Sequence, residues 1–304
     1  MYFLTYEWNG NQTVGILTAD QKQVIPLVAA EQHYYEDAIL PDTMLAIIND
    51  GENALQRVKK LAKKVANDKK CAILLRLNDV RIKAPIPRLT KNIFCIGRNY
   101  AEHAMEKDKG GDPNELIPKY PIFFTKPPTA VIGPNELIKN HKQITDALDY
   151  EAELAVVIGE KACYVNKEEA MNYVFGYTIF NDVTARDLQK QHLQWFRGKA
   201  LDASAPMGPY LVHKSVVHNP GNLDISLKVN GELRQNSNTQ KMIFNIPTII
   251  NTLSAGITLE PGDVIATGTP EGVGMYFKPP KFLHSGDRVA VTISGLSTLE
   301  NVVE

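Results

Sequence analysis

Apolar and polar positions alternate in short runs over the first 28 residues, with an interruption at Asn9–Gly10. This alternation is typical of strands, and an Asn-Gly pair favours a tight turn. The pattern then changes to a helical period. We expect one helix in "LPDTMLAIINDG", capped by Asp42 and ending before Gly51. A second helix, over residues 52–70, places on one face Leu55, Val58, Ala62 and Val65.

A proline-rich connector, "RIKAPIPRLTKN", occupies residues 81–92. Two prolines in three residues favour an extended linker, so we predict two domains, residues 1–85 and 90–304. Beyond the connector, short apolar runs alternate with turns, including the Asn-Gly hairpin signal in "VNGEL". Helical stretches are few, near residues 99–108, 167–173 and 246–254. The pattern predicts a mainly β protein with α+β elements, preceded by a small α+β N-terminal domain.

The composition excludes several classes of protein. The 304 residues carry a net charge of −1, which gives no electrostatic case for a nucleic acid or an anionic membrane as partner. No apolar run is long enough to span a bilayer, and the N-terminus lacks the features of a secretory signal. The three cysteines are scattered, which fits reduced thiols better than a disulfide framework. We therefore expect a cytoplasmic protein.

Acidic residues crowd the front of an otherwise apolar strand in "DYEAELAVVIGE", residues 149–160. Side chains alternate along a strand, so Glu151 and Glu153 point the same way, with Cβ atoms roughly 7 Å apart. Two such carboxylates repel each other, so the pair either faces water or shares a cation. A second apolar strand, "YTIFND", ends in Asp182. Three carboxylates without a cysteine or His-x-His pattern favour Mg²⁺, Mn²⁺ or Ca²⁺ over zinc.

Seven segments together make the chain resemble the fumarylacetoacetate hydrolase family over about residues 90–300. The resemblance implies a β-roll catalytic domain that is usually a homodimer. It also implies that Glu151, Glu153 and Asp182 hold one divalent ion per subunit, Mg²⁺ or Mn²⁺. The segments, in the family's order, are "IFCIGRNYAEHAMEKD", "PIFFTKPPTAVIGPNELI", "DYEAELAVVIG", "VFGYTIFNDVTARDLQ", "RGKALDASAPMGPYLV", "LKVNGELRQNSNTQKMIF" and "LEPGDVIATGTPEGVG".

His103 and Glu106 share one face of their segment if it is helical. An imidazole oriented by a carboxylate is the pattern of a general base, and a surface helix with an incidental histidine is the alternative. The resemblance implies the general base, on a mobile segment that closes over the site. The charged, glycine-rich residues 107–121 suit such a lid. His33 and Glu36 have the same spacing but lie outside the resemblance, so we expect them on the surface.

Lys199, in "WFRGKALDASAP", matches the family's active-site lysine and could stabilise an enolate. Arg197, two residues earlier, is the competing cation. The chain has no G-x-S-x-G elbow, so covalent catalysis is not expected. The resemblance also implies a set of substrate-binding residues, of which Thr269 would bind a carboxylate. The set is Arg98, Arg186, Gln189 and Thr269.

These groups predict metal-dependent cleavage of a C–C bond in a small 2-oxo or 2,4-dioxo acid, through a metal-bound enolate. Water activated by His103 and Glu106 would give hydrolysis of the acylpyruvate or fumarylacetoacetate type. Loss of a carboxylate would give decarboxylation, as with oxaloacetate. Movement of a proton would give isomerisation, as with 2-hydroxyhepta-2,4-diene-1,7-dioate. A non-catalytic scaffold or regulator is the remote alternative. The three reactions share the enolate, so the sequence predicts the intermediate better than the product.

Overall fold

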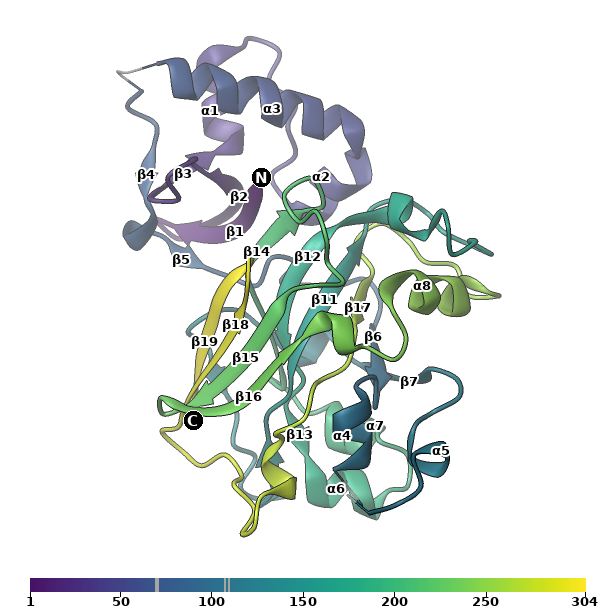
Figure 1. The fold of residues 1–304 in the computed structure, drawn as a ribbon. Helices are drawn as coiled ribbons and strands as arrows, with labels where there is room; N and C mark the ends of the chain where they lie inside the picture. Colours follow the sequence, from purple (N-terminus) through teal and green to yellow (C-terminus); the bar gives the residue numbers. More distant parts are fainter. Residues whose placement is uncertain (69–70, 107, 109) are drawn as a thin grey trace.

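A computed structural model of the protein describes residues 1–68, 71–106, 108 and 110–304. Among these residues, one twelve-stranded mixed sheet runs through the molecule, and a five-stranded sheet packs beside it (Figure 1). Short helices cover the outer faces and the ends of the strands. The prediction of a mainly β protein with α+β elements is therefore confirmed.

Two short strands of the large sheet lie outside its main strand order. β5 (Arg81–Ile82) pairs with β1 (Tyr2–Trp8), and β8 (Val131–Ile132) pairs with β14 (Ala205–His213). The main order runs β4 (Leu75–Arg76), β3 (Gln23–Pro26), β2 (Asn11–Leu17), β1 (Tyr2–Trp8), β14 (Ala205–His213), β12 (Val174–Asn181), β11 (Ala152–Ile158), β17 (Val264–Ala266), β6 (Ile93–Gly97) and β7 (Ile122–Lys126).

The second sheet is antiparallel except at β9, and a separate two-stranded ladder lies near the front of β11. The sheet runs β16 (Glu232–Asn238), β15 (Asp224–Val229), β18 (Arg288–Ile293), β19 (Ser297–Val303) and β9 (Leu137–Ile138), and the ladder pairs β10 (Leu148–Asp149) with β13 (Thr184–Ala185).

The N-terminal strands extend the same sheet as the strands that follow residue 90. The predicted turn at Asn9–Gly10 is present, with positive φ at both residues, and it joins β1 to β2. On its other side β1 pairs with β14, where Tyr2 lies opposite Val212. The sheet thus crosses the predicted boundary, and the division into residues 1–85 and 90–304 stays a prediction.

The helices depart from their predicted limits where side chains compete for the backbone. The N-cap is Thr43 rather than Asp42, because the Thr43 hydroxyl accepts the Ala46 N–H, while the helix ends before Gly51 as predicted. Residues 69–70 of the second predicted helix lie outside the described residues. The helices are α1 (Leu27–Tyr34), α2 (Met44–Asp50), α3 (Glu52–Asn67), α4 (Ala101–Met105), α5 (Pro113–Leu116), α6 (Arg186–Gln191), α7 (Phe196–Lys199) and α8 (Ile246–Ser254).

Two of the predicted helices are much shorter than expected. The 99–108 helix starts only at Ala101, because the buried Asn99 side chain bonds to the backbone of Phe244 and Thr267 instead. The 167–173 helix reduces to a 3₁₀ turn, Ala170–Tyr173. None of the described helices has the length and apolar character needed to cross a membrane.

Strand β11 is buried on both faces, and this burial positions the acidic residues at its front. Leu154, Val156 and Ile158 pack toward the second sheet, in one core cluster with Leu227 and Val291. Ala155 and Val157 belong to the opposite cluster, which includes the helices α2 and α3. Because the period of a strand is two, a one-residue slip would exchange these faces, so the core fixes the side on which the acids lie.

His213 ends β14 close to the N-terminus and is buried, with no ion pair to any residue that the structure describes. Its Nδ1 accepts the Ser215 N–H, 3.2 Å away, and its ring contacts Phe175 edge-on. Burial, with help from the N-terminal amine, lowers the pKa of His213 to about 4. The imidazole is therefore neutral in the folded protein at neutral pH.

The folded protein should lose stability as the pH falls through the range between the unfolded pKa of His213, about 6.5, and the folded value, about 4. In that range the unfolded chain binds a proton that the folded chain excludes. Between pH 7 and pH 5, we expect the free energy of unfolding of His213→Asn, measured by urea titration, to fall by about 1 kcal/mol less than that of the wild type. His218→Asn, an exposed control, should match the wild type. Parallel curves for all three proteins would contradict the prediction.

Candidate active site

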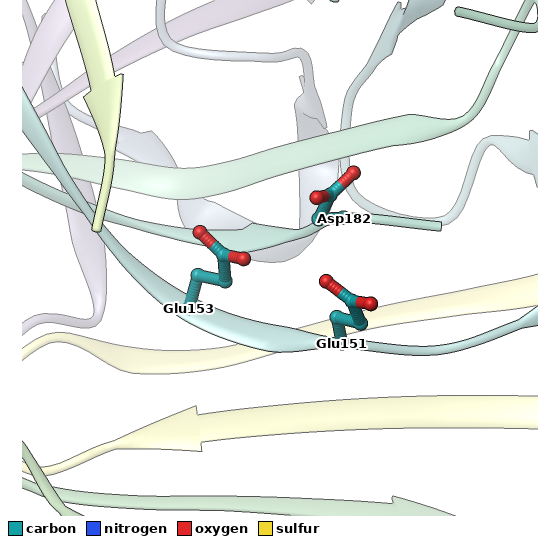
Figure 2. Close-up of side chains that lie close together, drawn as sticks. All are labelled: Glu151, Glu153 and Asp182. Carbon is teal, nitrogen blue, oxygen red and sulfur yellow. The ribbon is translucent and has the colours of Figure 1, made fainter. Parts of the chain in front are cut away.

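Three carboxylates converge where β11 begins and β12 ends. Glu151, directly before β11, and Glu153, within it, point toward Asp182, which directly follows the neighbouring strand β12 (Figure 2). The backbone N–H of Asp182 donates to Glu151 O at 2.8 Å, so the pairing of the strands holds the acids together. One oxygen from each carboxylate lies within 4.8 Å of the others. At most 5% of each residue is exposed, so the alternative of a water-facing pair is wrong.

Three buried cations surround the carboxylates. Lys199 Nζ lies 2.8 Å from Glu151 Oε2 and 2.6 Å from Asp182 Oδ2. Arg186 Nη1 lies 2.7 Å from Glu151 Oε1. The third cation, Lys126 at the end of β7, donates to Asp182 Oδ1 at 2.8 Å. Lys126 was not predicted from the sequence, although it closes the apolar strand in "PIFFTKPP".

Asp149 is a fourth buried carboxylate that the sequence analysis left without a role. It accepts Arg186 Nε at 2.8 Å, and it also accepts the N–H groups of Gly274 and Met275, at 2.7 and 3.0 Å. Asp149 therefore links Arg186 by hydrogen bonds to the backbone at Gly274 and Met275. Four carboxylates thus meet three cations, and one negative charge has no ionic partner.

Glu153 is the carboxyl group that forms no ion pair with the three cations, and its ionised form is the one that this environment disfavours. Burial works against ionisation of Glu151, but Lys199 and Arg186 lower its pKa to about 2. For Glu153, burial and the neighbouring Asp182 and Glu151 raise the pKa well above its usual range. Its hydrogen bond is to the Gly268 N–H, 2.8 Å from Oε2. An added positive charge beside Glu153 would therefore complete the balance of the cluster.

The residues present fit a hard divalent cation. The donor set is made only of carboxylate oxygens, which suits Mg²⁺ or Mn²⁺. Glu151, Glu153 and Asp182 would hold the ion, and its positive charge would favour the ionised form of Glu153, which burial and the neighbouring acids disfavour. Among the residues that the structure describes, Glu151, Glu153 and Asp182 form the group whose side chains lie close enough together to hold a metal ion.

His103 and Glu106 form a bonded pair beside the acids. His103 Nδ1 lies 2.8 Å from Glu106 Oε2, and the two side chains are 12% and 11% exposed, so the pair is largely shielded from solvent; its role as a general base stays a prediction. The other oxygen, Glu106 Oε1, accepts the N–H of Gly272 at 2.8 Å. Residues 107 and 109 of the expected lid lie outside the described residues, and its closing motion stays a prediction. His33 and Glu36 are exposed, as expected.

One cavity of about 610 Å³ lies at this site. Glu106, Glu153 and Asp182 are not among the residues that line it. Arg197, the competing cation, is exposed and does not line it. A second cavity of about 650 Å³, near Tyr177 and Lys214, has no acid in its wall. Of the residues expected at the site, those that line the first cavity are Arg98, His103, Glu151, Arg186, Gln189, Lys199 and Thr269.

Two arginines present unused donors at this cavity. Arg186 Nη2 is buried and has no hydrogen-bond partner among the described residues. Arg98 has positive φ, and its guanidinium lies 5.8 Å from the centre of the Trp195 ring. Arg98 makes no hydrogen bond or ion pair within the described part of the chain. Both groups are therefore available for negatively charged atoms of a ligand.

Comparison with known proteins places this site in a family. The family model described as "Fumarylacetoacetate (FAA) hydrolase C-terminal" matches residues 92–304. Oxaloacetate tautomerase YisK of Bacillus subtilis is 47% identical over 305 residues, with all of both chains covered.

Solved structures give the same result over the full length. The fumarylacetoacetate hydrolase of Exiguobacterium antarcticum is 37% identical with a TM-score of 0.82, covering 100% of this chain and 99% of that one. The 5-carboxymethyl-2-hydroxymuconate delta-isomerase of Mycobacterium smegmatis is 30% identical with a TM-score of 0.73, with the same coverage. The named relatives thus carry three different reaction names on one fold.

Glu153→Gln should remove most of the affinity for a divalent ion while leaving the fold intact, because the amide keeps the shape but not the charge. Loss of a residue that only hydrogen-bonds to a metal ligand typically lowers metal affinity by roughly 10- to 100-fold, so loss of the ligand itself should lower it further. Calorimetric titration with Mn²⁺ measures this directly. Asp187→Asn, which changes an acid in the same cavity outside the triad, is the matched control. Unchanged Mn²⁺ affinity in Glu153→Gln would show that the ion binds elsewhere.

Proposed function

Because the chain belongs to the fumarylacetoacetate hydrolase family, we propose that it interconverts the keto and enol forms of oxaloacetate or a closely similar 2-oxo dicarboxylic acid. Family membership makes it an enzyme of a superfamily whose named members include a tautomerase, a hydrolase and an isomerase. The observation that carries the proposal is one cavity whose wall carries Glu151 of the acidic triad together with Lys199 and His103. The relative named for oxaloacetate, 47% identical over the whole chain, supports this substrate.

The cluster of charges suits stabilisation of an enolate. A divalent ion held by the triad would supply Lewis-acid stabilisation of the charge that develops on the 2-oxo oxygen. Burial disfavours the charged form of Lys199, but Asp182 and Glu151 raise its pKa, so it remains an ammonium group. Two of its three hydrogens go to the carboxylates, which leaves one to donate to the substrate oxygen.

His103 is the group suited to move the proton. Its Nδ1 is held by Glu106, so its Nε2 remains to exchange a proton at the cavity. Removing a proton from the carbon next to the 2-oxo group and returning it to the oxygen converts ketone to enol. No bond between heavy atoms breaks, so the reaction needs no water and no leaving group.

Arg98 and the unbonded Nη2 of Arg186 favour a substrate with two carboxylates. Arg98 and Arg186 Nη2 both lie at the cavity without partners among the described residues, so each can bind one end of a C4 dicarboxylate. A 2-oxo acid with a single carboxylate would leave one arginine unused. The homodimer implied by the family resemblance stays a prediction.

Hydrolysis of a C–C bond in an acylpyruvate is the second candidate. The observation in its favour is the bonded pair of His103 and Glu106, which could deprotonate a water molecule instead of the substrate. The enolate released by that cleavage would be stabilised by the same Lys199. Decarboxylation of oxaloacetate would need the enolate-stabilising groups but no activated water.

The test follows the ultraviolet absorbance of freshly dissolved enol oxaloacetate with Mg²⁺ or Mn²⁺ present. His103→Ala should slow its metal-dependent conversion by about 10²–10⁴-fold, the usual contribution of a general acid or base. His33→Ala is the matched control, since His33 has a glutamate at the same spacing on the exposed surface, and it should leave the rate unchanged.

The same protein assayed with acetylpyruvate, and for pyruvate formed from oxaloacetate, decides between the candidates. A higher kcat/KM for acetylpyruvate cleavage than for oxaloacetate tautomerisation would place hydrolysis first. Absence of metal-dependent turnover of both compounds in the wild type would contradict the proposal. An unchanged rate in His103→Ala would remove the proton-transfer role from His103.

A further inference from the structure

Gln235, on β16 of the second sheet, is fully buried, and its side-chain amide connects two walls of the site. Its Oε1 accepts the backbone N–H of Ala152, 2.9 Å away, between Glu151 and Glu153. Its Nε2 donates to Pro270 O and to Thr269 Oγ1, both at 2.8 Å. The amide thus joins the strand of the acids to the turn that carries Thr269.

The backbone partners of Gln235 fix the orientation of its amide. A backbone N–H can only donate and a carbonyl can only accept, so Oε1 must face Ala152 and Nε2 must face Pro270. The second hydrogen of Nε2 then goes to the Thr269 hydroxyl, which acts as acceptor. That hydroxyl keeps its own hydrogen, which has no acceptor among the described residues. Thr269 lines the cavity, so this hydrogen is available to a ligand.

We propose that Gln235 is a positioning residue that makes Thr269 a hydrogen-bond donor to a carboxylate oxygen of the substrate. This inference rests on the proposed function, because it requires a carboxylate in the cavity. A free hydroxyl can turn to donate or to accept, but a hydroxyl that already accepts from Nε2 is pre-set to donate. The adjacent Gly268 donates to Glu153 Oε2, so the same turn holds the donor in register with the acidic triad.

Gln235→Glu tests the inference because it replaces Nε2, the donor to Thr269 Oγ1 and Pro270 O, by an oxygen with little change of shape. The acid still accepts from Ala152. In either protonation state it has no second hydrogen for Thr269, so the Thr269 hydroxyl turns and donates to the acid. Oxalate, titrated calorimetrically into the Mn²⁺-loaded protein, should bind about 10- to 100-fold more weakly, as expected for a lost bond to a charged group. KM for oxaloacetate should rise by a larger factor than kcat falls.

Gln235→Met separates positioning from packing. Methionine makes none of the three hydrogen bonds, so a purely structural role predicts a larger loss than in Gln235→Glu. Positioning predicts the reverse, because the Thr269 hydrogen stays free and oxalate affinity falls less. In a protein that already carries Thr269→Val, adding Gln235→Glu should not weaken oxalate binding further, because no hydroxyl remains at position 269. Thr269→Ser alone keeps the hydroxyl and should bind oxalate as the wild type does.

Asn301→Asp is the matched control for the change from amide to acid. Asn301 is buried on β19, where its amide donates to Gly133 O and Glu136 O at 2.9 and 2.8 Å, away from the cavity. Its stability should fall, but its affinity for oxalate should equal that of the wild type.

The outcomes distinguish this inference from the proposed function. Equal oxalate affinity in wild type and Gln235→Glu, or a loss in Gln235→Met as large as in Gln235→Glu, would overturn the positioning role and leave the proposed function intact. A fall in Mn²⁺ affinity that matches the fall in oxalate affinity would also overturn it, because Gln235 would then act through the acidic strand. Absence of oxalate binding to the Mn²⁺-loaded wild type would overturn both.

Discussion

The mutual repulsion of buried carboxylates is the constraint on which the rest of the site depends. Glu151, Glu153 and Asp182 lie together in a protein interior that cannot screen them, so opposite charge must be supplied from nearby. Lys199 and Lys126 are fully buried for this reason, although lysines are almost never fully buried unless paired. Removing one partner of such a pair typically costs about 3–5 kcal/mol, so each residue of the cluster constrains the others.

The turn after β17 contacts both the acidic cluster and the remaining functional groups through hydrogen bonds. Gly268 donates to Glu153, and Gly272 donates to Glu106 of the histidine pair. Both glycines have positive φ, and a Cβ at Gly272 would lie 2.1 Å from Arg234 O, so only glycine fits there. Because one short segment contacts the acids, the histidine pair and Gln235, small shifts of this turn would disturb all three together.

Strand periodicity and the family resemblance were sufficient to predict the acidic triad, since Glu151 and Glu153 are two residues apart and Asp182 follows a recognisable strand. Lys126 and Gln235 were not predicted, because their partners lie 56 and 83 residues away and no local pattern marks them. The helix limits near Asn99 were wrong for a similar reason: its side chain bonds to Phe244 and Thr267, which lie 145 and 168 residues away. The reaction could not be predicted, because tautomerisation, hydrolysis and decarboxylation share the enolate that these residues stabilise.

The most direct test of the charge argument is anomalous diffraction from crystals of the protein soaked with Mn²⁺ and oxalate. We expect one anomalous peak per chain within ligand distance of oxygens from Glu151, Glu153 and Asp182, with oxalate in contact with the ion. Crystals of Glu153→Gln treated in the same way should lack the peak. A peak at a different set of residues, or none beside the triad in the wild type, would contradict the claim that a divalent ion balances the buried acids.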